Sequence, residues 1–276
     1  MIGLVLGDTY IGNLIIKKLR FLKKDFIIID ISKKKLFKKQ KNSFPLSIGQ
    51  LGKCISILKN KSCNKVLFAG RVERPNFSKV KFDFKALYHL AKIIKETKKG
   101  DAYVINFITK LFEKEGFKIV NQTFFNPELV LKKGNHTKVK PNKKNYQDIR
   151  IGKKLVNNLK LKGITQGVIV VKGKIIIAED FKGTDFMLNK AKRKLNKYIS
   201  KKRRDGILLK FPKPNQDLRT DLPTIGIKTL KKCASLGLKG VVIKAKYNIF
   251  LDRKKSLKIA NKNKMFILAK WKKYLY

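Results

Sequence analysis

Acidic side chains are scarce in this sequence. Its 276 residues include 18 Asp and Glu against 68 Lys and Arg, so the formal net charge at pH 7 is +50. Such an excess is found in proteins that bind nucleic acids or anionic membranes, and also in chains of biased composition. Biased composition is favoured here, because lysines are spread along nearly the whole chain. In addition, only nine of the basic residues are Arg, the side chain that most often recognises bases through paired hydrogen bonds. The positive charge would in addition favour binding to an anionic membrane surface.

Cysteine and histidine are also rare. Cys54, Cys63 and Cys233 are scattered along the chain and form no CxxC pair. We therefore expect a reducing compartment, with no disulfide framework and no structural zinc site. His89 lies in an apolar helical pattern and is distant in sequence from His136. This spacing disfavours zinc-hydrolase and Ser/His/Asp chemistry.

The sequence lacks an apolar run of the roughly 18 to 20 residues that span a bilayer. Its longest runs, such as residues 26–31 and 167–171, have the length of buried strands. Residues 1–6 lack the basic lead-in and cleavage site of a signal peptide, and they are typical of a first strand. We expect a soluble, cytoplasmic protein.

Strand-like and helix-like patterns alternate in the first half of the chain. The expected strands are residues 2–6, 26–31 and 66–69, and the expected helices are residues 12–24, 49–58, 84–96 and 102–115. This alternation indicates a parallel sheet, which binds ligands beyond the carboxyl ends of its strands. A polar, lysine-rich stretch over residues 132–146 follows and predicts a domain boundary.

The second half also mixes strands and helices. Expected helices are residues 148–159, 185–198 and 225–235; expected strands are residues 167–171, 174–178, 206–210, 241–243, 249–251 and 266–268. We therefore predict an α/β protein with a Rossmann-like parallel α/β domain at residues 1–131. A distinct C-terminal α/β domain is expected at residues 132–276.

Gly7 and Gly70 each follow a predicted strand, and each is the first residue of a candidate anion-binding segment. The turn from Gly7 through Thr9 leads into a helix, which suits anion binding by backbone N–H groups, but a plain strand-to-helix turn fits equally well. Its spacing is neither GxGxxG nor a Walker loop. Gly70 is followed by Arg71 and Arg74, two guanidinium forks that suit a diphosphate. The alternative for this second turn is a surface ion pair between an Arg and the intervening glutamate.

Two further segments are candidates in the second half. Gly183, Thr184 and Asp185 precede a predicted helix and either cap it or help it to bind phosphate. Residues 210–226 form a loop with three prolines, which restrict the backbone. In that loop, carboxylates suit Mg²⁺ and basic side chains suit phosphate oxygens. The alternative is a salt-bridged loop between domains.

Several of these segments, in this order, resemble the UDP-2,3-diacylglucosamine pyrophosphatases of the LpxI type, enzymes of lipid A biosynthesis in some Gram-negative bacteria. The matching segments are residues 68–75, 99–101, 112–117, 166–167, 183–185 and 210–226. The last contains Asp-Leu-Pro-Thr-Ile-Gly at residues 221–226 and is highly specific.

The resemblance implies two α/β domains that hold the lipid substrate between them, and a homodimer peripheral to the inner membrane. It also implies Mg²⁺-dependent attack of water on the α-phosphorus of UDP-2,3-diacylglucosamine, which yields UMP and 2,3-diacylglucosamine 1-phosphate. Asp221 matches the essential aspartate of the family.

Residues and resemblance together define the expected site. The expected catalytic residues are Asp221, Asp217, Arg219 and Lys213, of which Asp221 and Asp217 would bind Mg²⁺. The expected substrate-binding residues are Gly7, Thr9, Gly70, Arg71, Arg74, Gln166, Gly183, Thr184, Asp185, Lys210, Gln216 and Thr224.

The chain departs from the family in two places. The family's first turn is typically richer in glycine than Gly7-Asp8-Thr9, and Ala102 stands where the family often has a second aspartate. The runner-up function is another nucleotide-diphosphate hydrolase with a different acceptor group. A nucleic-acid-binding protein is disfavoured, because the sequence has no GXXG loop between helices and no aromatic RNP strand.

Overall fold

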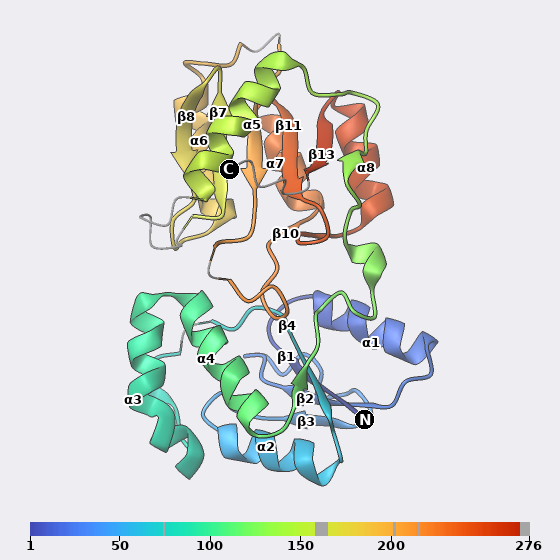
Figure 1. Cartoon of the computed structure of the whole chain (residues 1–276), viewed down its shortest axis with the longest axis vertical. Coiled ribbons are helices and arrows are strands. Elements are labelled where there is room, and N and C mark those ends of the chain that lie inside the picture. Colours follow the sequence, from blue (N-terminus) through green and yellow to red (C-terminus); the bar gives the residue numbers. More distant parts are fainter. Residues whose placement is uncertain (74, 158–164, 201–202, 215, 271–276) are drawn as a thin grey trace. The chain divides into compact units, whose positions relative to one another are not determined.

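The computed structural model describes residues 1–73, 75–157, 165–200, 203–214 and 216–270, and the chain folds into two compact units (Figure 1). Unit 1 is Met1–Pro127 together with Asp217–Asp221, and unit 2 is Glu128–Gln216 with Leu222–Tyr276. Each unit has its own sheet with flanking helices. The predicted α/β fold, with a parallel sheet near the N-terminus and a separate sheet in the C-terminal region, is confirmed.

Unit 1 is built on a fully parallel sheet of five strands. In chain order these are β1 (Ile2–Leu6), β2 (Phe26–Asp30), β3 (Ser43–Pro45), β4 (Lys65–Ala69) and β5 (Lys118–Ile119). Their spatial order is β3-β2-β1-β4-β5, which matches the first five strands of the Rossmann order 3-2-1-4-5-6. β1 is buried along its whole length, which explains why its sequence is apolar without alternation.

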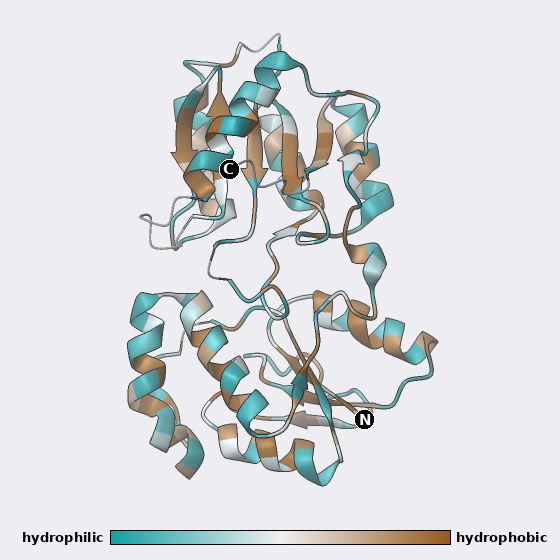
Figure 2. Ribbon diagram, in the orientation of Figure 1, coloured by the Kyte–Doolittle hydropathy of each residue, from teal (hydrophilic) through white to brown (hydrophobic). Residues whose placement is uncertain are grey.

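Four helices cover the two faces of this sheet. They are α1 (Ile11–Phe21), α2 (Leu51–Asn60), α3 (Phe84–Lys99) and α4 (Asp101–Lys114). One apolar cluster joins the Val5 face of the sheet to α2, α3 and α4. α1 packs on the other face, where Gly12 lies against Leu6. Figure 2 shows that hydrophobic and hydrophilic residues alternate along these helices, as expected of helices that pack on a sheet with one face.

Unit 2 has a mixed sheet of six strands. They are β6 (Gly134–Asn135), β7 (Gly167–Val171), β8 (Lys174–Ala178), β9 (Asp205–Lys210), β11 (Leu238–Lys244) and β13 (Phe266–Lys270). Their order is β6-β13-β11-β9-β7-β8, with β13, β11 and β9 parallel and the outer strands antiparallel to their neighbours. A separate parallel pair is formed by β10 (Thr224–Ile225) and β12 (Ile249–Phe250).

Alternate side chains of these strands enter two different cores. One core contains Ile169, Leu208 and Val241 together with helices α6 (Thr184–Leu195), α7 (Ile227–Ser235) and α8 (Arg253–Lys262). The other contains Val168 and Leu209 and is covered by α5 (Lys143–Val156). Short 3₁₀ turns at Phe77–Lys79 and Pro127–Leu129 complete the elements. Among the described residues, no helix is long and apolar enough to cross a membrane.

Local structure departs from the sequence predictions in several places. The lysine-rich stretch 132–146 contains β6 and the start of α5, which begins at Lys143 because Asn142 and Asn145 form a capping box. The predicted end of that helix at residue 159 lies outside the described residues. Ile225 belongs to β10, so α7 starts two residues later than predicted. Helix α8 and strands β3 and β5 were not predicted.

Candidate functional site

The carboxyl ends of β1 and β4 form a closely packed junction. Strand order reverses between these two strands, and in such sheets ligands bind beyond the carboxyl ends at the point of reversal. The Gly7 N–H donates to the Ala69 carbonyl over 2.9 Å, and a Cβ on Gly7 would lie 2.4 Å from the Arg71 carbonyl oxygen. Gly70 has φ +92° and packs on the Gly7 backbone. Both positions therefore require glycine.

The predicted substrate-binding residues of unit 1 lie around this junction. The Thr9 N–H donates to the Gly7 carbonyl over 3.0 Å, one residue before the N-cap of α1. Arg71 is exposed, and its backbone carbonyl accepts the Asp8 N–H over 2.7 Å. Glu73 pairs with Lys33 over 3.5 Å. Arg74 lies outside the described residues.

Residues 217–221, here called the Asp217 turn, belong to unit 1 although their chain neighbours belong to unit 2. The side chain of Gln122, just after β5, donates to the Thr220 carbonyl over 2.6 Å and to the Phe68 carbonyl in β4 over 3.0 Å. The Gln122 N–H donates to the Arg219 carbonyl, and Asn121 Nδ2 donates to the Leu218 carbonyl. Gln122 is buried. Its amide thus ties the turn to the end of β4.

Asp217 and Arg219 hold the turn from inside. The Asp217 carbonyl accepts the N–H groups of Thr220 and Asp221, over 3.2 and 3.0 Å. Its carboxylate accepts the Arg219 N–H over 2.9 Å, Nε over 3.1 and 3.3 Å and Nη2 over 2.9 Å. The second arm of the guanidinium, Nη1, donates to Glu113 Oε1 of α4 over 2.5 Å. We call Glu113, Arg219 and Asp217 the arginine clamp.

The clamp shifts the pKa values of Asp217 and Arg219. Burial alone would raise the pKa of Asp217, but the hydrogen bonds from Arg219 outweigh it and lower that pKa below 3.8. The hydrogen bonds to Asp217 and Glu113 raise the pKa of Arg219. Asp217 and Arg219 therefore stay charged at neutral pH, and the guanidinium predicted to bind phosphate is paired with the side chains of Asp217 and Glu113.

The turn presents Asp221 at its end, half-buried. Both carboxylate oxygens of Asp217 already accept hydrogen bonds from Arg219, so a Mg²⁺ ion there would compete with Arg219 for them. Among the described residues, no group of three or more His, Cys, Asp or Glu side chains is arranged to hold a metal ion. Mg²⁺ is commonly bound by one or two carboxylates that share it with substrate phosphates and water, so a site with a single carboxylate fits this metal.

The predicted substrate-binding residues of unit 2 form a second polar group. Lys210, at the end of β9, is buried and donates from Nζ to Thr184 Oγ1 over 2.7 Å and to the Thr224 carbonyl over 3.2 Å. Thr184 Oγ1 donates to Glu179 over 2.7 Å, and Gln166 Nε2 donates to the same carboxylate over 3.2 Å. The structure thus brings four predicted residues together around Glu179, which was not predicted.

Three other predicted residues have different surroundings. Asp185 pairs with Lys228 and Lys232 of α7, over 3.1 and 3.0 Å. Gln216 is buried, and its side-chain oxygen accepts the Lys213 N–H over 2.9 Å. Gly183 precedes α6 with φ +86°, where glycine is favoured.

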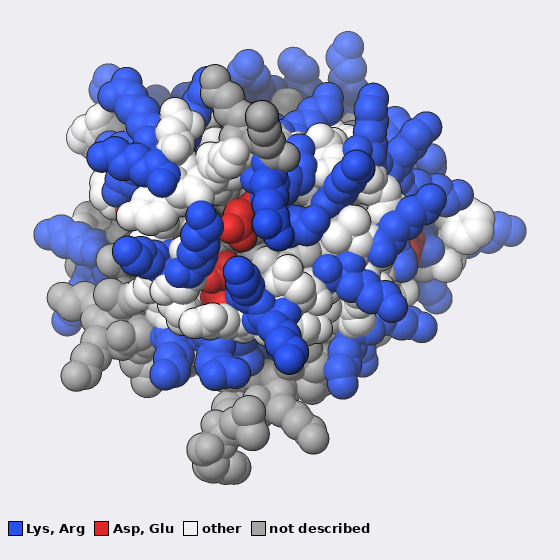
Figure 3. All heavy atoms as spheres, turned by 90° about the horizontal axis from the view of Figure 1, so that it is seen from above, with Lys and Arg blue, Asp and Glu red and all other residues white. Residues whose placement is uncertain are grey.

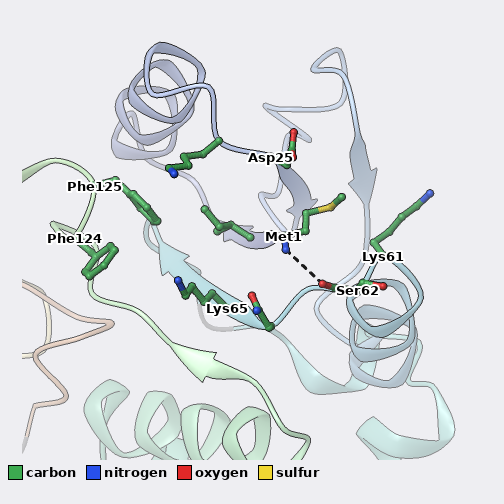
Figure 4. A pocket seen from close by; sticks show the side chains of 10 residues that line it. Met1, Asp25, Lys61, Ser62, Lys65, Phe124 and Phe125 are labelled. Atoms are coloured by element: carbon green, nitrogen blue, oxygen red, sulfur yellow. Dashed lines mark hydrogen bonds between the residues drawn. The ribbon is translucent and has the colours of Figure 1, made fainter.

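One pocket of unit 1 lies at the amino-terminal ends of β1, β2 and β4. It has a volume of about 580 Å³, and its lining includes Met1, Asp25, Lys65 and Phe125 (Figure 4). Asp25 and Lys65 stand at the amino-terminal ends of β2 and β4. Because doubly wound sheets bind ligands at the opposite strand ends, this pocket is not part of the candidate site.

Comparison with known proteins covers both units. The family model of the LpxI N-terminal domain matches residues 1–129, and that of the LpxI C-terminal domain matches residues 132–268. The chain belongs to the LpxI family. Among curated proteins, it is 34% identical over 226 residues to the UDP-2,3-diacylglucosamine pyrophosphatase LpxI of Caulobacter vibrioides, covering 81% of this chain and 80% of that protein. The resemblance inferred from the sequence motifs is confirmed.

In this LpxI family member, sequence reasoning missed three residues that hold the candidate site together through hydrogen bonds. Gln122 lies between the predicted helix 102–115 and the predicted boundary at residues 132–146, where no strand was predicted because β5 has only two residues. Glu113 lies 106 residues from its partner Arg219, so no local pattern links them. Glu179 carried one signal, since it is an acidic residue in an acid-poor chain beside Gly183 and Thr184.

Proposed function

We propose that this chain is a UDP-2,3-diacylglucosamine pyrophosphatase of lipid A biosynthesis, which hydrolyses the diphosphate to UMP and 2,3-diacylglucosamine 1-phosphate. Family membership and the name of the Caulobacter relative support the substrate class. The observation that carries the proposal is the Asp217 turn, which fixes Asp221 beside the strand ends where doubly wound sheets bind ligands.

In this proposal a water oxygen attacks the α-phosphorus on the uridine side. The bond from that phosphorus to the bridging oxygen breaks, and the bridging oxygen leaves with the acylated sugar phosphate. Asp221 orients the attacking water and accepts its proton, and the arginine clamp keeps this carboxylate in place. Displacing a reacting group by 1 Å lowers the rate about 10²-fold. The many hydrogen bonds that hold the Asp217 turn are therefore consistent with a need to position Asp221 accurately.

Mg²⁺ is the proposed cofactor. It would be held by Asp221 and the diphosphate oxygens, where it would neutralise charge and polarise the phosphoryl group. Asp217, first expected as a second ligand, would act through its hydrogen bonds to Arg219. Oxygen ligands of this kind favour Mg²⁺ over zinc.

The remaining proposed contacts come from both polar groups. In unit 1, the N-terminus of α1, which follows Gly7 and Thr9, and the Arg71 guanidinium next to Gly70 suit phosphate oxygens. In unit 2, the buried ammonium of Lys210 suits an anionic group. The Gln166 side-chain oxygen is buried and has no hydrogen-bond partner within the described residues, so it suits a substrate donor. Lys213, Gln216 and Thr224 remain proposed contacts.

We further propose a cytoplasmic homodimer that associates with the inner membrane, where an acylated substrate resides, and that binds no nucleic acid. On the face drawn in Figure 3, Lys and Arg side chains are scattered over the surface and are interrupted by only a few acidic ones. A sequence-reading protein would instead be expected to gather Arg on one groove-sized patch.

One experiment tests the function. Purified protein is incubated with UDP-2,3-diacylglucosamine, and the products are separated and identified. We expect UMP and 2,3-diacylglucosamine 1-phosphate from the wild type, and a loss of about 10³-fold or more with Asp221→Asn at an unchanged thermal midpoint. Uridine with an acylated sugar diphosphate, or a fully active Asp221→Asn variant, would contradict the assignment.

A further inference from the structure

Helix α3 carries large apolar side chains on its solvent face. Phe84, Leu87 and Tyr88 are 87%, 58% and 77% exposed, and Ala91 is exposed as well. Their spacing of i, i+3, i+4 and i+7 places them in one line along the helix. We call these four residues the α3 stripe. Single exposed apolar side chains are normal on protein surfaces, but a contiguous group indicates an interaction surface.

The orientation of α3 is fixed by contacts on its other side. Ala86 is buried in the core of unit 1, and the ring of His89 packs edge-on against Phe107 of α4. The Asp83 carboxylate caps the helix by accepting the Ala86 N–H over 2.9 Å. The stripe is therefore held outward by a helix whose opposite face is already packed.

Lysines flank the stripe at both ends. Beyond its C-terminal end, the same exposed face continues with Lys92, Lys95, Lys98 and Lys99. Before the helix, Lys79 and Lys81 are exposed. The acidic Glu96 is buried and already accepts hydrogen bonds from Lys99 over 3.0 Å. The surface around the stripe is thus strongly positive.

We propose that the α3 stripe docks this protein on an anionic lipid surface. Aromatic and aliphatic side chains bordered by lysines match the boundary between acyl chains and acidic headgroups. A second copy fits less well, because a symmetric contact through this patch would bring two lysine-rich surfaces together. The inference rests on the proposed membrane association, and it is independent of the assignment of Asp221.

The test uses the full chain and vesicles of phosphatidylcholine with or without phosphatidylglycerol. The variant Phe84→Gln/Leu87→Gln/Tyr88→Gln replaces the large apolar side chains of the stripe by glutamine, which is polar and keeps good helix propensity. The matched control is Phe181→Gln/Ile175→Gln, which replaces two exposed apolar residues of unit 2. Sedimentation is compared at low and raised salt, because the net charge alone binds any anionic vesicle at low salt.

At raised salt we expect the wild type and the control to stay on phosphatidylglycerol vesicles. The stripe variant should bind at least about tenfold more weakly, since apolar insertion is not screened. Leu87→Trp fluorescence should be quenched by brominated lipid, but that of Phe181→Trp should not, with Trp271 as a common background.

Three results would overturn the proposal. The first is a stripe variant that binds like the wild type at raised salt. The second is loss of self-association in the stripe variant with unchanged vesicle binding, which would assign the stripe to a second copy. The third is Leu87→Trp that is not quenched. Hydrolysis of detergent-dispersed substrate, expected to be equal in all variants, separates failure of docking from failure of the proposed activity.

Discussion

The arginine clamp permits a prediction that separates positioning from substrate binding. Arg219 makes its contacts within the protein, to Asp217 and Glu113, so we expect it to act on activity through the position of Asp221. Arg219→Lys keeps the charge but cannot reach both carboxylates with a planar fork. Glu113→Gln removes one arm of the clamp from outside the turn.

The magnitudes follow from exposure. The Asp217 side chain is only 13% exposed, so its hydrogen bonds to Arg219 should contribute about 1.5 kcal/mol. Arg219 and Glu113 are 42% and 38% exposed, so their pair should contribute only about 0.5 kcal/mol. Because a shift of the reacting group by 1 Å costs about 10²-fold, we expect kcat/KM to fall about 10- to 100-fold in Arg219→Lys and about threefold in Glu113→Gln.

The assay is a double-mutant cycle on hydrolysis of UDP-2,3-diacylglucosamine. The double variant should be no worse than Arg219→Lys alone, because both changes disrupt the same clamp. Arg20→Lys is the control, since this exposed arginine of unit 1 binds Gln40 away from the turn. Additive losses, or a fully active Glu113→Gln beside an impaired Arg219→Lys, would refute positioning and return Arg219 to direct phosphate binding.

Further predictions concern metal, mechanism, unit 2 and acid stability. EDTA should stop hydrolysis and Mg²⁺ should restore it; recovery with zinc alone would contradict the oxygen-ligand site. In isotopically labelled water the heavy oxygen should appear in UMP, and label in the lipid phosphate would place attack on the other phosphorus. Lys210→Met should lower both the thermal midpoint and the activity, because it leaves Glu179 buried without a nearby positive charge. Adding Glu179→Gln should restore the midpoint but not the activity. If activity also returned, Lys210 would serve only to balance the charge of Glu179. Because the pKa of Asp217 is lowered by folding, its contribution to stability is present above 3.8 and is lost as the pH falls through the folded value. Acid unfolding of Asp217→Asn should therefore converge with that of the wild type only below about pH 4, and convergence near neutrality would contradict this.

Sequence patterns predicted the elements that consist of apolar runs bounded by turn residues. The hairpin of β7 and β8 was predicted with its bounds because apolar runs flank Lys172-Gly173, both of which have positive φ. Helix α8 was not predicted because lysines dominate Arg253–Lys262 and only Ser256 and Ala260 are fully buried. Its packing against α7 is a tertiary contact, and a local apolar period cannot reveal it.

The candidate site was predictable in its residue types but less so in their roles. Lys210, Thr184 and Gln166 were predicted separately, and the structure joins them through Glu179. Arg219 was expected to bind phosphate because its planar, charged guanidinium suits phosphate oxygens. Its pairing with Glu113 depends on the folding of a distant helix beside the loop, which no spacing rule encodes.

The Asp217 turn has a consequence for any attempt to cut this protein in two. The Gln122 amide is buried, and one of its partners, the Thr220 carbonyl, is 98 residues away in sequence. A fragment ending at residue 129, where the N-terminal family match ends, would lack the Thr220 carbonyl. It would also lack the rest of the Asp217 turn, so the Gln122 amide would lose this hydrogen-bond partner. Such a fragment should be less stable than its fold suggests, and a synthetic peptide of residues 216–222 should bind and stabilise it. During synthesis, unit 1 therefore becomes complete only after Glu128–Gln216, the larger part of unit 2, has been translated.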